Sequence, residues 1–289
     1  AILHSSMLKP LTSVAEMTRI EQALAFFYRT ERCASYGLNE VDTDGMPKYV
    51  AVVRQHAPRG SVVLEFGAGT WRSPLMLHQA GFRVVGCDLF SEEDLADFRE
   101  RIGDAAQLVS YDGHRIPMPD ASVNVVTSRN VFEHILHVDA MLGELDRVLA
   151  PGGIFVLVGP NWSGPHNAIR ALVQMSRGAS RYCQFESAWQ ACAGLVRSLV
   201  WDLQVRTDPN PRFLLIVPRM RDGKIRFEDS DDDAVHLCHP VSFRKWFTVR
   251  GYDVVHFNRF GSRWRALWNG LCPTLATTNE LVFRKPMRA

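Results

Sequence analysis

The feature that most constrains the fold is a regular alternation of short apolar runs and amphipathic runs over residues 61–160. The apolar runs, such as VVLEF at 62–66, have the length and β-branched content of buried strands. Helical spacing marks the runs between them, and Ser91 with Asp94 predicts a capping box before a helix over 92–101. Strands separated by helices form parallel βαβ units. Because such crossovers are right-handed, the sequence predicts a Rossmann-like, doubly wound α/β sheet.

Outside this core the alternation stops, and the chain divides into four predicted parts. Residues 1–60 show helical patterns and are expected to form an N-terminal helical cap, while 61–160 form the α/β core. In residues 161–235 two helical patterns, a hairpin-like segment and the acidic run EDSDDD (228–233) replace the alternation. We expect this insertion after the fifth strand to fold over the strand ends as a substrate cap, with the acidic run as a solvated loop. Residues 236–289 are expected to complete the core.

Composition and charge narrow the class of protein. The chain has 289 residues, of which 46% are hydrophobic and 22% charged, as in an ordinary globular protein. A net charge of +2 provides no general attraction to nucleic acid. No run approaches the ~20 apolar residues of a membrane-spanning helix, and the first residues lack a signal-peptide core. We therefore expect a cytoplasmic protein with no nucleic-acid partner and no membrane span.

The cysteines and histidines do not predict a metal site. Six cysteines are scattered without a CxxC pair, which is typical of a reduced protein. His236, Cys238 and His239 are three potential ligands, but no second group has matching spacing. An extended segment would also turn His239 away from the other two.

The stretch VVLEFGAGTW, residues 62–71, ends the first expected strand on Gly67 and Gly69. Glycines in such a turn bring main-chain N–H groups close to a ligand, and doubly wound sheets bind ligands beyond the carboxyl ends of their strands. A dinucleotide needs a third glycine, but Arg72 stands there, and Glu65 would repel a pyrophosphate. The pattern therefore favours a cofactor that has a cationic portion and no phosphates.

Two further carboxylates follow the next two expected strands. Asp88 ends the second strand, where a carboxylate can accept both hydroxyls of a ribose. Asp112 ends the third and precedes Gly113, a pair suited to the exocyclic amine and a ring nitrogen of adenine. Each aspartate alone is equally consistent with a loop cap. Acidic residues at three successive strand ends nevertheless indicate a site for a nucleoside cofactor.

At this point the segments VLEFGAGT, GCDLF, YDGHRIPMPDASVNVV, SRNVFEHI and LDRVLAPGGIFVLV resemble the class I S-adenosylmethionine-dependent methyltransferases, most closely the small-molecule type 11 group. The likeness covers about residues 60–160 and resumes weakly from 238. It implies a seven-stranded sheet with 279–286 as the antiparallel strand. It also implies a site for S-adenosyl-L-methionine, released as S-adenosyl-L-homocysteine. The site would comprise Glu65, Gly67, Gly69 and Asn130 at the methionine portion, Asp88 at the ribose, Asp112 and Gly113 at the adenine, and Phe66, Ala68 and Leu89 beside them.

Trp71 departs from the family pattern, which commonly has glycine at this position. Two interpretations are open. The indole either packs against the N-terminal helices or forms a wall of the substrate or methionine pocket.

Histidines are the candidate catalytic groups. In methyl transfer the protein aligns a nucleophile with a methyl group that is already activated, and a hydroxyl nucleophile benefits from a general base. The resemblance implies that His134 lies near the reactive end of the cofactor, as a base or as a residue that only shapes the pocket. His166 is a second candidate, and His236 and His239 are weaker ones. The leading prediction is methylation of a hydroxyl on a small-molecule acceptor such as a sugar, a natural product or a phenol.

Two other classes of function are open. One is a non-catalytic binding or assembly protein that retains the fold. The other is a nicotinamide-dependent oxidoreductase, against which the missing third glycine and Asp112 argue. Nucleic-acid methylation is a weaker variant, because the basic stretches SFRKWF and SRWRALW are consistent with exposed helix faces.

The aromatic residues of the insertion are expected mainly to form its small core, because the apolar stripe around Trp189 has helical spacing. One or two of them would be free to stack on a ring or sugar. An exposed apolar side of the insertion would serve a homodimer or a lipid-like acceptor equally well. The residues concerned are Trp162, Tyr182, Phe185, Trp189 and Trp201.

Overall fold

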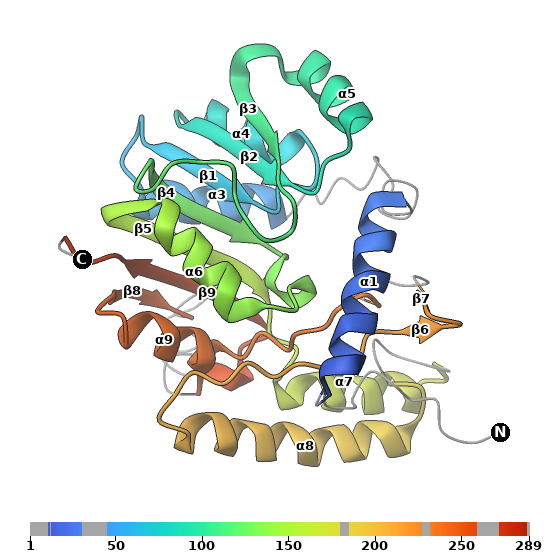
Figure 1. The fold of residues 1–289 in the computed structure, drawn as a ribbon. Helices are drawn as coiled ribbons and strands as arrows, with labels where there is room; N and C mark the ends of the chain where they lie inside the picture. Colours follow the sequence, from blue (N-terminus) through green and yellow to red (C-terminus); the bar gives the residue numbers. More distant parts are fainter. Residues whose placement is uncertain are drawn as a thin grey trace.

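The computed structural model describes residues 11, 13–30, 45–179, 185–226, 232–258 and 272–287. Within these residues the centre of the molecule is a seven-stranded sheet in the order β3-β2-β1-β4-β5-β9-β8 (Figure 1). β9 runs antiparallel to both of its neighbours, β5 and β8. The predicted Rossmann-like sheet with one antiparallel strand is confirmed. Its strands are β1 (Val62–Phe66), β2 (Arg83–Asp88), β3 (Ala106–Ser110), β4 (Val123–Arg129), β5 (Leu149–Pro160), β8 (Asp253–Phe257) and β9 (Thr278–Arg284).

The strand order reverses at β1, which lies between β2 and β4. Phe66 at the end of β1 pairs with Cys87 of β2 and with Ser128 of β4. Asp88 at the end of β2 pairs with Ser110 of β3. The carboxyl ends of four parallel strands therefore meet at one edge, where an open α/β sheet binds its ligands.

Helices cover both faces of the sheet because the strand residues alternate between them. Leu64 and Phe66 of β1 belong to a buried cluster with residues of α6 and α9, whereas Val63 belongs to a second cluster with residues of α3 and α4. The predicted capping box is present at α5, where the N–H of Asp94 donates to Ser91 Oγ (3.0 Å) and the Asp94 carboxylate accepts from the N–H of Ser91 (3.1 Å). The helices are α3 (Gly45–His56), α4 (Arg72–Gln79), α5 (Glu92–Ile102), α6 (Val138–Val148) and α9 (Pro240–Thr248), with 3-10 turns at Gly103–Ala105, Phe132–His134 and Pro273–Leu275.

The two N-terminal helices pack on different parts of the molecule. α3 lies on the sheet beside α4, whereas α1 (Val14–Thr30) lies next to the small hairpin of β6 (Met220–Arg221) and β7 (Lys224–Ile225) (Figure 1). Ile20, Leu24 and Phe27 of α1 are buried there. The division of the chain at residues 60, 160 and 235 stays a prediction.

The insertion contains two helices that lie side by side, α7 (Pro165–Ser176) and α8 (Ala188–Thr207) (Figure 1). Small residues of the two helices, Ala168, Ala171 and Ala191, are buried together. Phe185 is buried with them and Trp162 and Trp201 are partly buried, as predicted, whereas Tyr182 lies outside the described residues. The prediction that the stripe around Trp189 forms this core is wrong, because the Trp189 side chain is 79% exposed.

The acidic run also differs from its prediction. We expected residues 228–233 to form a solvated loop, but Asp232 and Asp233 are 1% and 0% exposed in the segment that follows the hairpin. Residues 228–231 lie outside the described part of the chain. The burial has a physical reason, because Asp232 lies 3.5 Å from Arg219 and Asp233 accepts a hydrogen bond from Tyr28. None of the helices in the described residues has the length and apolar content that a membrane crossing requires.

Candidate active site

The glycine turn after β1 holds the chain close to the loop that follows β4. Gly67 (φ +76°) and Gly69 (φ +67°) have left-handed backbone conformations, which favour glycine. A Cβ atom at Gly67 would overlap the side chain of Val131, so the two loops are in direct contact. The N–H groups of Gly67 and Ala68 donate to the Cys87 carbonyl (2.8 and 3.2 Å). The turn is therefore fixed to β2 on one side and to the β4 loop on the other.

Glu65 lies buried beneath this turn. Its Oε1 accepts hydrogen bonds from the hydroxyl groups of Tyr49 (3.2 Å) and Ser73, while Oε2 has no hydrogen-bond partner among the described residues. Burial raises the pKa of the Glu65 carboxyl to about 7, although these two hydrogen bonds act in the opposite direction. A buried carboxyl with one unpartnered oxygen is suited to a cationic group at the turn.

Asp88 connects β2 to the same turn. One oxygen accepts from the N–H of Gly69 and the other from the N–H of Leu89, each at 2.7 Å. The carboxylate is therefore held in one orientation at the end of β2. Asp88 also borders the cavity at this edge of the sheet, and a carboxylate oxygen can accept more than one hydrogen bond.

Asp112 follows β3 in a tight turn. Its Oδ1 accepts from the backbone N–H groups of His114 (2.8 Å) and Arg115 (2.7 Å), and these hydrogen bonds hold the pKa of Asp112 below its usual value. Gly113 has φ +95°, so this turn also requires a left-handed residue. Asp112 is exposed, and its carboxylate stays charged at neutral pH.

A cavity of about 270 Å³ opens at this edge of the sheet. Helix α1 supplies Leu24 and Tyr28 to its wall, and the segment from the β4 loop to α6 supplies residues such as Ile135 and Met141. Seven of the residues predicted from the sequence line it: Gly67, Asp88, Leu89, Asp112, Gly113, Asn130 and His134.

The other predicted residues lie outside the lining of this cavity. Glu65 is beneath the turn, Phe66 belongs to the core under α6, and Ala68 packs toward α5. The N–H of Gly69 is directed to Asp88. His166 lies in α7, where burial lowers the pKa of its imidazole to about 4.

His134 faces a buried acidic residue from the insertion. Its Nδ1 lies 3.2 Å from Oδ2 of Asp233, which also accepts a hydrogen bond from the Tyr28 hydroxyl. The Tyr28 and His134 rings are in edge-to-face contact, with centroids 6.3 Å apart. Burial alone would raise the pKa of Asp233, but the charge and hydrogen bond of His134 and the Tyr28 hydroxyl hold it below its usual value. Three segments that are distant in sequence therefore meet at one imidazole.

The two weaker histidine candidates have structural contacts. Nδ1 of His236 is 3.0 Å from the carbonyl of Phe132, and burial lowers the pKa of His236 to about 4. His239 accepts from the N–H of Val241 at the start of α9 and lies 3.2 Å from Asp202. In the described residues no group of three or more His, Cys, Asp or Glu side chains could hold a metal ion.

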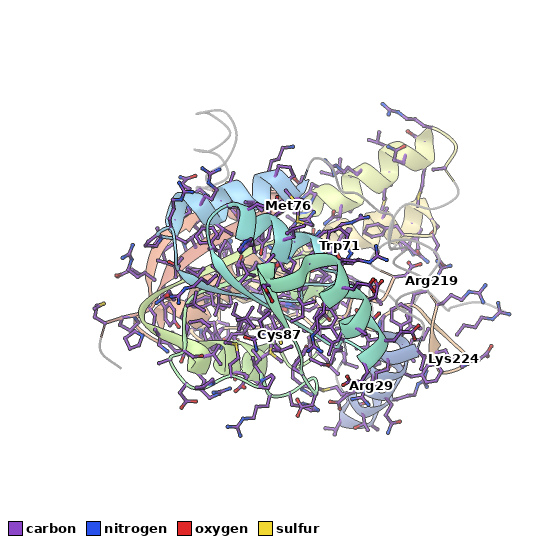
Figure 2. The ribbon with its side chains drawn as sticks, turned by 90° about the horizontal axis from the view of Figure 1, so that it is seen from above. Arg29, Trp71, Met76, Cys87, Arg219 and Lys224 are labelled. Carbon is purple, nitrogen blue, oxygen red and sulfur yellow. The ribbon has the colours of Figure 1, made fainter. Side chains whose placement is uncertain are left out.

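Among the described residues, Trp71 is found in neither of the two predicted arrangements. It is partly buried against a cluster that includes Phe90, Leu95 and Phe98, on the side of α5. In Figure 2 Trp71 lies near Met76 of α4 and well apart from Arg29 at the end of α1. The indole therefore packs between the turn and α5, because Trp71 is the residue at which α4 begins.

Two functional candidates were not predicted from the sequence. Tyr28 lies on the apolar face of α1, where the pattern indicates core packing rather than a polar contact. Asp233 is one of several acids in a run, and nothing in the run distinguishes it from the others.

Comparison with known proteins finds a methyltransferase domain in the same part of the chain. Residues 64–157 match a family model described as a methyltransferase domain. A probable S-adenosylmethionine-dependent methyltransferase of Mycolicibacterium smegmatis is 34% identical over 113 residues, which are 37% of this chain and 40% of that protein. An uncharacterized methyltransferase of Mycobacterium leprae is 26% identical over 186 residues, which are 62% of this chain and 65% of that protein. The matched residues therefore span less than two thirds of the length of each of these two relatives.

Two solved structures have the same fold. The Burkholderia thailandensis 1,6-didemethyltoxoflavin-N1-methyltransferase, with bound 1,6-didemethyltoxoflavin and S-adenosylhomocysteine, has a TM-score of 0.55 at 14% identity, covering 97% of this chain and 94% of that one. A protein from Pyrococcus horikoshii has a TM-score of 0.52 at 13% identity, covering 90% and 98%. At these identities the likeness concerns the fold.

Proposed function

We propose that this chain, whose residues 64–157 match a methyltransferase domain, transfers a methyl group from S-adenosylmethionine to a hydroxyl of a small-molecule acceptor. The observation that carries the proposal is the cavity at the switch point, which is lined by Asp88 and Asp112 and also by His134. The carboxylates of Asp88 and Asp112 are suited to binding a nucleoside, and the imidazole of His134 is suited to accepting a proton. The family match favours this activity over a nicotinamide-dependent oxidoreductase.

The residues around the turn fit S-adenosylmethionine. Glu65 keeps one buried oxygen, Oε2, without a partner in the described residues, and a nearby cation would stabilise its charged form. Asp88 would accept the ribose hydroxyls and Asp112 the adenine amine. Gly67 brings the backbone to the cavity wall without a side chain in the way. When bound, the cofactor supplies a methyl carbon whose bond to positive sulfur breaks with the electron pair remaining on sulfur.

His134 would be the general base. Nδ1 lies 3.2 Å from the Asp233 carboxylate and Nε2 lies 4.0 Å from that of Glu133, so Nε2 would be the nitrogen that accepts the proton of the acceptor hydroxyl. Asp233 would hold the ring in one orientation and stabilise the imidazolium that forms, and Tyr28 would hold Asp233. A neutral amine needs no such base, so this arrangement favours an oxygen nucleophile.

The acceptor would bind on the side of the cavity that α1 closes. Leu24, Ile135 and Met141 make that wall largely apolar, and α1 would exclude water from the reacting atoms. The space suits a small ring or sugar rather than a polymer. The Burkholderia thailandensis neighbour, whose structure contains 1,6-didemethyltoxoflavin, supports a small acceptor as a class.

Calorimetric titration of S-adenosylhomocysteine tests the cofactor site first. Asp88→Ala should weaken binding at least about tenfold, because it removes both a ligand of the ribose and the group that holds Gly69. Asp97→Ala, on the exposed side of α5, is the matched control and should bind like wild type. Failure of the wild-type chain to bind would overturn the proposal.

Transfer of a labelled methyl group to a panel of phenols, sugars and hydroxylated natural products tests the chemistry. His134→Ala should lower kcat by about 10²–10⁴-fold, as for loss of a general base, with S-adenosylhomocysteine affinity retained. Cofactor binding by wild type without transfer to any acceptor would favour the non-catalytic alternative.

A further inference from the structure

The outer face of α8 is an apolar surface that the proposed function does not use. Figure 1 shows α8 along the edge of the molecule, with α7 and α9 between it and the sheet. Trp189 is 79% exposed, and Leu199 and Leu203 are 59% and 62% exposed. Cys192 is exposed as well. We name this surface the α8 seam, which consists of Trp189, Cys192, Val196, Leu199 and Leu203.

The spacing of the seam is that of a coiled coil. Successive seam residues are three, four, three and four positions apart, which is the a/d pattern of a heptad. The opposite side of the helix faces the protein and carries the buried residues Ala191, Gly194, Ser198 and Val205, with Leu195 and Trp201 partly buried beside them. α8 therefore packs on its own chain with one side and presents the residues of the seam outward on the other. Single exposed leucines are ordinary, but a seam in heptad register is patterned for another helix.

We infer that a second copy of this chain covers the seam, with the two α8 helices packed antiparallel about a two-fold axis. Antiparallel coiled coils place a positions opposite d positions. In that register Val196 packs against Leu199 of the partner subunit and Cys192 packs against Leu203 of the partner subunit. The two-fold axis repeats both layers, so one surface is complementary to itself, as a symmetric dimer requires.

The ends of the seam are complementary in the same register. The next d position after Leu203 is Arg206, which is exposed and bonded to Asp202 (2.8 Å). It lies opposite Trp189 of the partner subunit, so a guanidinium meets an indole ring at each end of the interface. None of these layers places like charges opposite each other. From Trp189 to Arg206 the paired surface would extend for about 25 Å along the helix axis, at about 1.5 Å per residue.

Charge substitutions at the central layer test the pairing in solution. Light scattering after size exclusion should give wild type a mass twice that of the 32.6 kDa chain. Val196→Glu with Leu199→Glu should give the single-chain mass, because four carboxylates would meet at the axis. Val196→Lys with Leu199→Lys should do the same. An equimolar mixture of the two variants should regain the double mass, because each layer then pairs Glu with Lys.

Controls separate the interface from folding and from other occupants. Met287→Glu, at another exposed apolar residue, should stay dimeric. Both double variants should bind S-adenosylhomocysteine like wild type, which shows that they are folded. A wild-type monomer at about 100 µM, or a mixture that stays monomeric, would overturn the inference. Sedimentation of a monomeric wild type with vesicles of anionic phospholipid would assign the seam to a membrane surface instead and would also overturn it.

Discussion

At the scale of single residues, Glu65 links the cofactor site to stability. Its pKa is raised to about 7 in the folded chain and returns to the ordinary value of 4.5 when the chain unfolds. The folded state therefore holds the proton more tightly. The contribution to stability is fully present below pH 4.5 and is lost as the pH rises through about 7.

We predict that wild type loses roughly 3 kcal/mol of unfolding free energy between pH 4.5 and 8 through this group, and that Glu65→Gln removes that loss. Urea unfolding at several pH values gives the unfolding free energy of each protein, and the two plots of this free energy against pH should differ in slope. Equal slopes would contradict the predicted burial effect. A cationic cofactor portion would favour the charged form, so S-adenosylhomocysteine affinity should rise with pH through about 7 in wild type and stay level in the variant.

At the scale of elements, the turn between β1 and α4 depends on close approach as well as on conformation. We predict that Gly67→Ala lowers stability by about 3 kcal/mol and abolishes measurable cofactor binding, because it adds a strained φ and an overlap with Val131. Gly60→Ala is the matched control, because Gly60 has a similar φ (+79°) with open space around it. It should cost about 1 kcal/mol and leave binding unchanged. Thermal unfolding and calorimetry distinguish the two, and equal effects would exclude the overlap as the cause.

The strands, the turn and the strand-end acids could be predicted because each depends on local pattern. A buried parallel strand is a short apolar run, and the ends of such strands converge in any doubly wound sheet. The exposed stripe of α8 could not be predicted in the same way. Periodicity shows which side of a helix is apolar, but whether that side is covered depends on which side packs on the rest of the chain, here the side of Ala191, which is buried with residues of α7. The position of Trp71 likewise depends on the tertiary contact with α5.

At the scale of the whole molecule, the cavity is assembled from parts that no local pattern connects. α1 supplies Tyr28, the loop after β4 supplies His134, and the end of the insertion supplies Asp233. The sheet fixes the position of His134. Tyr28 and Asp233 reach His134 only because α1 packs on the segment that contains the β6–β7 hairpin and Val235. Composition could not predict this contact, because an acidic run has the same sequence whether it is solvated or buried.

The contact predicts that Asp233 acts through His134. Asp233→Asn should lower kcat about 10²-fold or more with little change in KM, since the imidazolium that forms in the transition state loses its counter-charge. Asp232→Asn is a matched control, because Asp232 is equally buried but lies beside Arg219. It should cost comparable stability in thermal unfolding and leave kcat near wild type. If both variants lowered kcat equally, Asp233 would be only a structural support, whereas a selective loss with unchanged S-adenosylhomocysteine affinity would make it the residue that positions the base.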